Sequence, residues 1–157
     1  MRIGHSIDVH KFTDERKLIL GGVKMNHKGL AGHSDADVLL HSVAEAILGA
    51  LALGDLGSHF PDTDNTFKGI DSKVLVLSVM KLVHKHGYRV GNIDCQIIAE
   101  TPKMSPHIVK MRQNIADLLQ VNINQVSVKA TTTEKLGFIG NSEGIAAATT
   151  VLMEEVL

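Results

Sequence analysis

An Asp8-Val9-His10 tripeptide lies near the start of the chain, in an otherwise apolar stretch that is typical of a strand. Side chains two residues apart in a strand share a face, so Asp8 and His10 can bind one ion while Val9 points into the core. A third ligand can come from His41, in a helical run over 35–53. Three such ligands leave a tetrahedral zinc ion one open position for substrate, which indicates a catalytic metal site. Ordinary hydrogen-bonded side chains are the alternative.

Two carboxylates flank His41 on its own helix face, Asp37 four residues before it and Glu45 four residues after it. A metal-bound histidine usually donates from its second ring nitrogen to such an acceptor, which fixes the tautomer. We therefore expect Asp37 or Glu45 to orient the imidazole ring of His41. An ion pair on the helix surface is the alternative interpretation.

A second group of chemically capable residues runs from Lys129 to Phe138. Its three threonine hydroxyls, the carboxylate of Glu134 and the flanking lysines can contact phosphate oxygens and give an oxygen ligand to magnesium. An edge strand with solvated threonines would have the same composition. Taken alone, this segment does not separate the two interpretations.

The composition limits the function classes. The chain has 157 residues, which predicts one domain over 1–157. A net charge of -1 without a basic run, and only 3% aromatic residues, argue against nucleic-acid binding. The single Cys95 is expected to be a buried hydrophobe, which suits the reducing cytoplasm. No signal peptide or membrane-spanning run is visible, so we expect a cytoplasmic protein with no membrane partner.

The periodicity predicts an α/β protein in the broad sense, of the α+β type: a mainly antiparallel or mixed sheet with helices packed on one face. We expect a hairpin of strands 3–12 and 17–25 joined by a polar turn at 13–16, with a bulge or a close approach of another segment at Gly21-Gly22. A first helix should follow an N-cap at Ser34 and end near Gly54. The remaining expected elements are a loop over 55–69, a helix over 71–86, a strand over 88–100, a turn over 102–106, a helix over 108–119, and strands over 126–133 and 145–156.

From Arg2 to the C-terminal strand the chain resembles the 2-C-methyl-D-erythritol 2,4-cyclodiphosphate synthase family. Several long motifs in the family's order make the resemblance specific. They are Asp8-Val9-His10, His33-Ser34-Asp35, Asp55-Leu56-Gly57, Phe60-Pro61-Asp62-Thr63-Asp64 and the segment from Lys129 to Phe138.

The resemblance implies zinc, or another divalent transition metal, on Asp8, His10 and His41. It also implies magnesium, or manganese, on Glu134, with His33 and Thr132 as transition-state stabilisers. The residues implied for substrate binding are Asp8, Val9, His10, His33, Ser34, Asp55, Leu56, Gly57, Phe60, Pro61, Asp62, Thr63, Asp64, Ala99, Glu100, Thr101, Pro102, Lys103, Met104, Ser105, Ala130, Thr131, Thr132, Thr133, Glu134, Phe138 and Asn141.

The reaction that the resemblance implies belongs to the non-mevalonate isoprenoid pathway. The 2-phosphate of 4-diphosphocytidyl-2-C-methyl-D-erythritol 2-phosphate attacks the β-phosphorus, which closes a cyclic diphosphate and expels CMP. The resemblance also implies a homotrimer with sites between subunits. A zinc-dependent phosphohydrolase acting on a nucleotide-linked diphosphate is the competing enzyme class, and a non-catalytic zinc-stabilised binding module is the third hypothesis.

The chain departs from the family at two positions. Many members carry Arg where this chain has Asn141 and Glu where it has Ala148. In those members both side chains line a cavity on the three-fold axis that can hold an isoprenoid diphosphate. Because Asn cannot replace a bidentate guanidinium, we expect weak binding of isoprenoid diphosphates there while catalysis persists.

Overall fold

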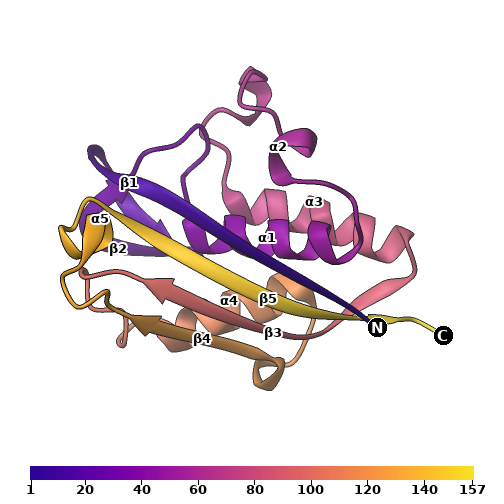
Figure 1. Ribbon diagram of the computed structural model, residues 1–157. Helices are drawn as coiled ribbons and strands as arrows, with labels where there is room; N and C mark the ends of the chain where they lie inside the picture. Colours follow the sequence, from indigo (N-terminus) through magenta and orange to yellow (C-terminus); the bar gives the residue numbers. More distant parts are fainter.

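The computed structural model describes residues 1–157 and contains one five-stranded sheet in the order β2-β1-β5-β3-β4 (Figure 1). The strands are β1 (Arg2–Leu20), β2 (Val23–Leu30), β3 (Tyr88–Ile98), β4 (Val126–Thr131) and β5 (Gly144–Glu155). Only the β3 and β4 pair is parallel. This mixed sheet confirms the predicted fold class.

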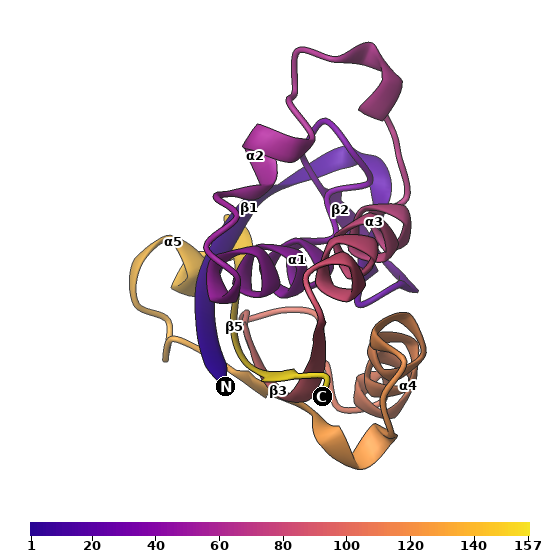
Figure 2. The same cartoon turned by 90° about the vertical axis from the view of Figure 1, so that its right-hand side faces the viewer.

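Three helices cover one face of the sheet: α1 (Val38–Ala50), α3 (Ser72–Lys85) and α4 (Ile108–Leu119) (Figure 2). The shorter helical segments are α2 (Leu56–His59), η1 (Asn65–Phe67), η2 (Ile123–Gln125) and α5 (Gly137–Gly140). The bounds of α3 and α4 agree with the predicted helices. The loop predicted over 55–69 instead contains α2 and η1, whose caps are the carboxylates of Asp55 and Asp64.

Helix α1 packs directly on β1. A Cβ atom added to Gly4 would lie 1.9 Å from the carbonyl oxygen of Ala46, so only glycine permits this approach. The side chains of Leu39, Val43 and Ile47 from α1 are fully buried beneath the sheet. This close contact fixes how far His41 stands from the ligands on β1.

The opposite face of β1 carries apolar residues in contact with solvent. Ile3, Ile7 and Val9 are 71%, 61% and 46% exposed. The expectation that Val9 points into the core is therefore wrong. Because α1 covers the face that carries Gly4 and Asp8, the alternation of the strand turns Val9 outward.

The predicted position of the hairpin turn is also wrong. Strand β1 runs through 13–16 without a turn. It changes partner from β5 to β2 between Lys11 and Phe12, and its register with β2 is irregular from Thr13 to Leu18. The turn lies at Gly21 and Gly22, which have φ angles of +58° and +71°. Two consecutive residues with positive φ match the right-handed twist of a hairpin, and glycine adopts that conformation without strain.

The first helix begins three residues later than an N-cap at Ser34 requires. Its N-cap is Asp37, whose side chain accepts from the backbone N–H of Leu40 at 3.0 Å. The helix ends at Ala50 rather than near Gly54. Residues 34–36 therefore form a loop beside α1, and this places Asp35 against the start of α3 and Ser34 beside His41.

The lone Cys95 is fully buried in β3, as predicted. Burial raises the pKa of its thiol to about 12, so it stays neutral and packs as a small hydrophobe. No helix combines the length and the apolar character that crossing a membrane requires.

Candidate active site

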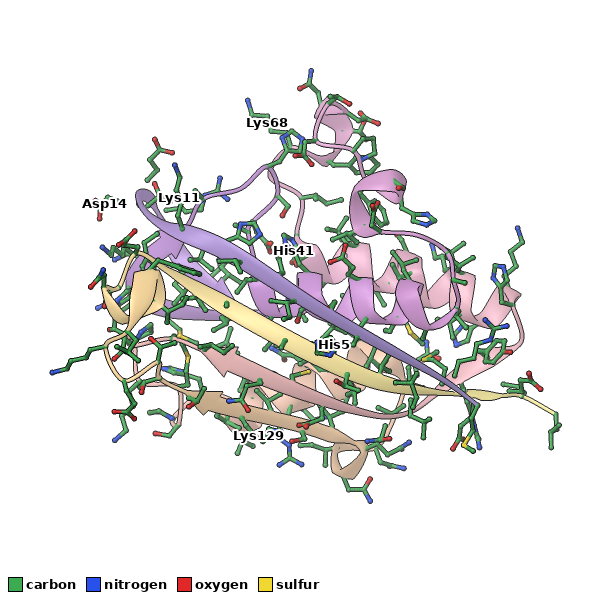
Figure 3. All side chains as sticks on the ribbon, viewed as in Figure 1. His5, Lys11, Asp14, His41, Lys68 and Lys129 are labelled. Atoms are coloured by element: carbon green, nitrogen blue, oxygen red, sulfur yellow. The ribbon has the colours of Figure 1, made fainter.

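Asp8, His10 and His41 meet between β1 and α1, and we refer to them as the triad. The Oδ2 atom of Asp8 lies 3.0 Å from Nε2 of His10 and 3.2 Å from Nδ1 of His41. These two nitrogens are 3.3 Å apart. The three side chains are 25%, 18% and 12% exposed, so the cluster is sheltered but open to a ligand. One carboxylate and two imidazoles whose ligand atoms lie this close together are a donor set that fits a divalent metal such as zinc. Figure 3 labels His41, the member of the triad on α1.

The electrostatics of the triad keep its carboxylate ionised. Burial favours the neutral form of Asp8, but hydrogen bonds and charge from His10 and His41 hold the pKa of Asp8 well below its usual range. Burial also opposes the charged form of His10, and the hydrogen bonds to Asp8 and Ala31 outweigh it, so the pKa of His10 is raised. Asp8 is therefore a ready anionic ligand near neutral pH.

The predicted partners of the His41 ring are wrong. The carboxylate of Asp37 is fully buried and accepts from the backbone N–H groups of Gly21, Gly22 and Leu40, at 2.9, 2.7 and 3.0 Å. Burial raises the pKa of Asp37 to about 6 against these three hydrogen bonds. Asp37 holds the hairpin turn to the start of α1 instead of orienting a ligand.

Glu45 also faces elsewhere, towards the backbone N–H of Leu56 at 3.4 Å. The ring nitrogen Nε2 of His41 instead lies 3.0 Å from Oγ of Ser34 and 2.9 Å from Oγ of Ser72. Ser72 begins α3, so spacing around His41 could not reveal it. The only local signal in the sequence is Asp71-Ser72 at the start of a helix. That pattern predicts a helix N-cap and does not indicate a functional role for Ser72.

A pocket of about 190 Å³ opens beside the triad. It brings together three of the predicted segments: 33–34, 55–57 and 60–64. Its lining residues are His10, Gly32, His33, Ser34, His41, Leu56, Gly57, Phe60, Asp62, Phe67, Ile70 and Leu75. The lining thus combines two members of the triad, His10 and His41, with apolar side chains such as Phe60.

The loop residues around this pocket are held by their own side chains. Asp55 accepts from Oγ of Ser58 at 2.5 Å and from its N–H at 2.8 Å. Nε2 of His33 lies 3.2 Å from the carbonyl oxygen of Asp64, to which it donates. Pro61 and Thr63 are exposed and do not line the pocket.

A second cluster forms where β3 and β4 end, and we call it the turn cluster: Glu100 with residues 130–135. Oε1 of Glu100 accepts from the N–H and hydroxyl of Thr133, at 3.1 and 3.3 Å, and from the N–H of Lys135 at 3.1 Å. These contacts, led by the Lys135 amide, lower the pKa of Glu100. Glu134 is exposed in a turn with a φ angle of +53°, and its Oε1 accepts from the Thr132 hydroxyl at 3.4 Å.

The predicted segments 99–105 and 130–134 therefore meet, although 99–105 is not uniformly accessible. Ala99 and Met104 are buried in the core, whereas Lys103 and Ser105 are exposed. The rest of the segment contains the cis peptide between Thr101 and Pro102. Only some of these side chains can contact a ligand directly.

The triad and the turn cluster share one end of the sheet but do not touch within the chain. The strand register places Val9, Ala146, Ile98 and Thr131 in one row across β1, β5, β3 and β4. Neighbouring strands lie about 4.8 Å apart, so the two clusters are roughly 14 Å apart. No turn-cluster residue lines the pocket beside the triad.

Phe138 and Asn141 lie beyond the turn cluster, in and just after α5. Phe138 is 50% exposed, and Nδ2 of Asn141 donates to Oε1 of Glu143 at 3.4 Å. His5 lies on the face of β1 opposite α1, where its Nδ1 is 3.0 Å from Oγ1 of Thr150 (Figure 3). These residues belong to neither cluster.

An α+β sheet that carries a carboxylate and two imidazoles beside a pocket is the arrangement of a metal-dependent enzyme. A model described as the YgbB family matches residues 1–154, and the chain belongs to this family. Two similar relatives bear the name 2-C-methyl-D-erythritol 2,4-cyclodiphosphate synthase. The relative from Chlorobium phaeobacteroides is 58% identical over 99% of this chain and 98% of its own, and one from Bacillus cereus is 57% identical over 98% of each.

Solved structures agree with these sequence relatives. A CDP complex of IspF from Plasmodium falciparum has a TM-score of 0.87 at 36% identity and covers 99% of this chain and 97% of its own. The bifunctional IspDF from Campylobacter jejuni has a TM-score of 0.94 at 43% identity over 98% of this chain. This chain spans only 42% of that bifunctional protein, so the similarity concerns one part of it.

Proposed function

We propose that this protein is a 2-C-methyl-D-erythritol 2,4-cyclodiphosphate synthase. The observation that carries the proposal is the convergence of Asp8, His10 and His41 beside a pocket that also contains His33 and Ser34. The names of relatives at 57–58% identity over almost the whole chain support it. We also place the reaction in the cytoplasm, where a free thiol such as Cys95 stays reduced.

The reaction is an intramolecular phosphoryl transfer. An oxygen of the substrate's 2-phosphate forms a bond to the β-phosphorus, and the bond from that phosphorus to the oxygen bridging to the α-phosphorus breaks. The bridging oxygen leaves on CMP, so water is neither consumed nor released. No general base is needed, because the attacking phosphate is already ionised near neutral pH.

We propose that zinc binds the triad and that magnesium binds Glu134 together with the substrate's diphosphate. These cations supply charge neutralisation for two anionic groups that must approach each other. The oxygen and nitrogen donors of the triad favour zinc or a similar transition metal, whereas a lone exposed carboxylate favours magnesium.

The remaining residues position the substrate. His33 and Thr132 are proposed to donate hydrogen bonds to phosphoryl oxygens as negative charge shifts during transfer. Glu100 holds the turn that carries Thr132 and Glu134. The pocket walls hold the flexible methylerythritol chain in a folded conformation, which favours ring closure.

We further propose a homotrimer in which each site combines the triad of one subunit with the turn cluster of its neighbour. Within one chain the two clusters are roughly 14 Å apart, or three strand spacings. A single diphosphate group cannot contact both clusters across that distance, which supports a site shared between subunits. Ile3, Ile7 and Val9 are exposed on the face of β1 opposite α1, and this supports the burial of that face against another subunit.

The competing function is a zinc phosphohydrolase, and isotope labelling separates the two. The protein is incubated with 4-diphosphocytidyl-2-C-methyl-D-erythritol 2-phosphate, zinc and magnesium in oxygen-18 water, and the products are analysed by mass. We expect CMP and an unlabelled cyclic diphosphate. A linear product with one heavy oxygen would identify a hydrolase, and metal and substrate binding without turnover would favour a binding module. A His41→Ala variant controls for contaminating activity.

A further inference from the structure

We propose that Ser72 and Asp35 are positioning residues for the metal site: together they fix the tautomer of His41 so that its Nδ1 presents a lone pair to the ion. The inference rests on the proposed function, because it takes the triad as a metal site. It assigns a role to two residues, one on α3 and one in the loop before α1, that contact the reacting groups only through His41.

The starting point is the environment of the two ring nitrogens. Nδ1 of His41 faces the other ligands, Asp8 at 3.2 Å and His10 at 3.3 Å. Nε2 faces away from them, with Oγ of Ser72 at 2.9 Å. A neutral imidazole carries one proton, so the group at Nε2 decides which nitrogen can bind a metal.

The direction of each hydrogen bond follows from counting protons. The Ser72 hydroxyl has one hydrogen, and Oγ lies in a short hydrogen bond with Oδ1 of Asp35, a carboxylate that can only accept. The hydroxyl therefore donates to Asp35, and its oxygen accepts from Nε2–H of His41. A chain of two hydrogen bonds thus keeps a proton on Nε2, so that Nδ1 presents its lone pair to an ion once that ion replaces the contact between Nδ1 and Asp8.

Asp35 is itself held in place. Its Oδ2 accepts from the backbone N–H of Ser72 at 3.0 Å, and its Oδ1 accepts from the N–H of Asp37 at 3.1 Å. Its own N–H donates to the carbonyl oxygen of Ile70 at 3.0 Å. These hydrogen bonds therefore join the loop before α1 to the start of α3 beside Nε2 of His41.

Ser34 is a weaker candidate for this role. Its Oγ lies 3.0 Å from Nε2 of His41 and accepts from the N–H of Ala36 at 3.2 Å, but no carboxylate takes its hydrogen. It can therefore present either a hydrogen or a lone pair to the ring. Only Ser72, fully buried and bound to Asp35, excludes the wrong tautomer.

His10 reaches the same result by a simpler contact, which supports the interpretation. Its Nδ1 lies 2.6 Å from the carbonyl oxygen of Ala31, an acceptor only, so Nδ1 carries the proton and Nε2 faces the other ligands. Both histidines thus have their outward nitrogen paired with an acceptor. Such partners raise the basicity of a ligating imidazole, and their removal typically costs about 10–100-fold in metal affinity.

The test compares Ser72→Ala with Ser42→Ala. Ser42 follows His41 and is also fully buried, but its hydroxyl contacts the carbonyl oxygen of Leu39 at 2.8 Å and Oγ1 of Thr149 at 2.7 Å, away from the ring. Both variants lose one buried hydroxyl, so a general packing effect would appear in both. The N-cap of α3 is Asp71, so Ser72→Ala leaves the cap intact.

Two measurements are made on each full-length variant. Zinc affinity comes from competition with a chromophoric chelator, and the hydrogen bond at Nε2 of His41 comes from nitrogen NMR of the zinc-loaded protein, in which the ion occupies Nδ1. We expect Ser72→Ala to bind zinc about 10–100-fold more weakly and to show faster exchange of the Nε2 hydrogen with solvent. Asp35→Asn should shift both readouts in the same direction by less, and Ser42→Ala should change neither. Should Ser72→Ala fail to fold, Asp35→Asn decides.

Zinc affinity and Nε2 hydrogen exchange unchanged in Ser72→Ala would overturn the inference, and so would an equal loss in Ser42→Ala. Zinc binding by the unchanged protein is the reference that separates the two proposals. If the unchanged protein binds no zinc, the metal-dependent function fails together with this inference. If it binds zinc and the variants do not differ from it, only the positioning role fails.

Discussion

The triad and the turn cluster lie at the same end of one sheet, yet their side chains are held in different ways. Asp8, His10 and His41 are mostly buried, and each ring nitrogen has a partner within the chain. In the turn cluster, Thr132 and Glu134 are exposed, and their only side-chain hydrogen bond is to each other. The first cluster is preorganised before any ligand arrives, whereas in the second Thr132 and Glu134 have no side-chain partner other than each other.

The largest effect is expected from removing a triad ligand. His41→Ala, His10→Ala or Asp8→Asn should reduce zinc from about one ion per chain to a trace, because two remaining ligands do not hold the ion tightly. Glu134→Gln should keep its zinc and lose magnesium-dependent turnover. Elemental analysis after gel filtration measures this, with His84→Ala, an exposed histidine on α3, as the control. Full zinc content in His41→Ala would show that the triad is not the metal site.

Mixing damaged chains tests whether the two clusters act across subunits. His41→Ala and Glu134→Gln chains are dissociated, mixed in equal amounts and reassembled. If each site takes its triad from one subunit and its turn cluster from another, random mixing leaves about a quarter of the sites intact. Activity that stays at zero despite subunit exchange proven by mass spectrometry would place both clusters of a site in one chain.

The buried Asp37, beside the triad at the start of α1, should make the unfolding free energy depend on pH. Its pKa is raised to about 6 in the folded protein, so the folded state holds a proton that the unfolded chain has already released. The stabilisation is complete well below pH 4 and is lost as pH rises through about 6, a total change of roughly 3 kcal/mol. We expect the unfolding free energy of the unchanged protein, relative to Asp37→Asn, to fall by about 2 to 2.5 kcal/mol between pH 4 and pH 7. A constant difference in urea titrations across that range would contradict the assignment.

The smallest effect is expected from substitutions of Glu100 in the turn cluster. All three hydrogen bonds to Glu100 end on Oε1, so Glu100→Gln keeps an acceptor there and loses only the charge. We expect KM to rise by about two- to tenfold, with more in Glu100→Ala, while zinc content stays unchanged. Steady-state kinetics beside elemental analysis checks both. A loss of zinc in either variant would mean that the two clusters are coupled within one chain.

The sequence predicted those features that depend on local pattern. The bounds of α3 and α4 follow from apolar periodicity, and the Asp8 and His10 pair follows from the alternation of a strand. The hairpin turn was misplaced because polar residues at 13–16 have the composition of a turn, whereas the two glycines have its geometry. Propensity alone does not tell which of the two segments, 13–16 or Gly21-Gly22, forms the turn and which forms the irregularity in the strand.

The partners of His41 could not be predicted for a different reason. Carboxylates four residues away on a helix are an obvious choice, but Asp37 lies at the N-cap, where unpaired backbone N–H groups take its oxygens. The actual partner, Ser72, belongs to another helix and is brought close only by tertiary packing. Contacts of that kind have no periodic signature in one sequence.

The pairing of β1 with β5 has a consequence for the order of events during synthesis. Asp8 and His10 stand opposite Ala147 and Ile145, so two ligands made early are held by a strand that is made much later. A nascent chain that has not yet released β5 from the ribosome has both ligands on an unpaired strand. We therefore expect metal loading at the proposed site to be a late step that follows closure of the sheet, so that a bound ion would mark a chain whose folding is finished.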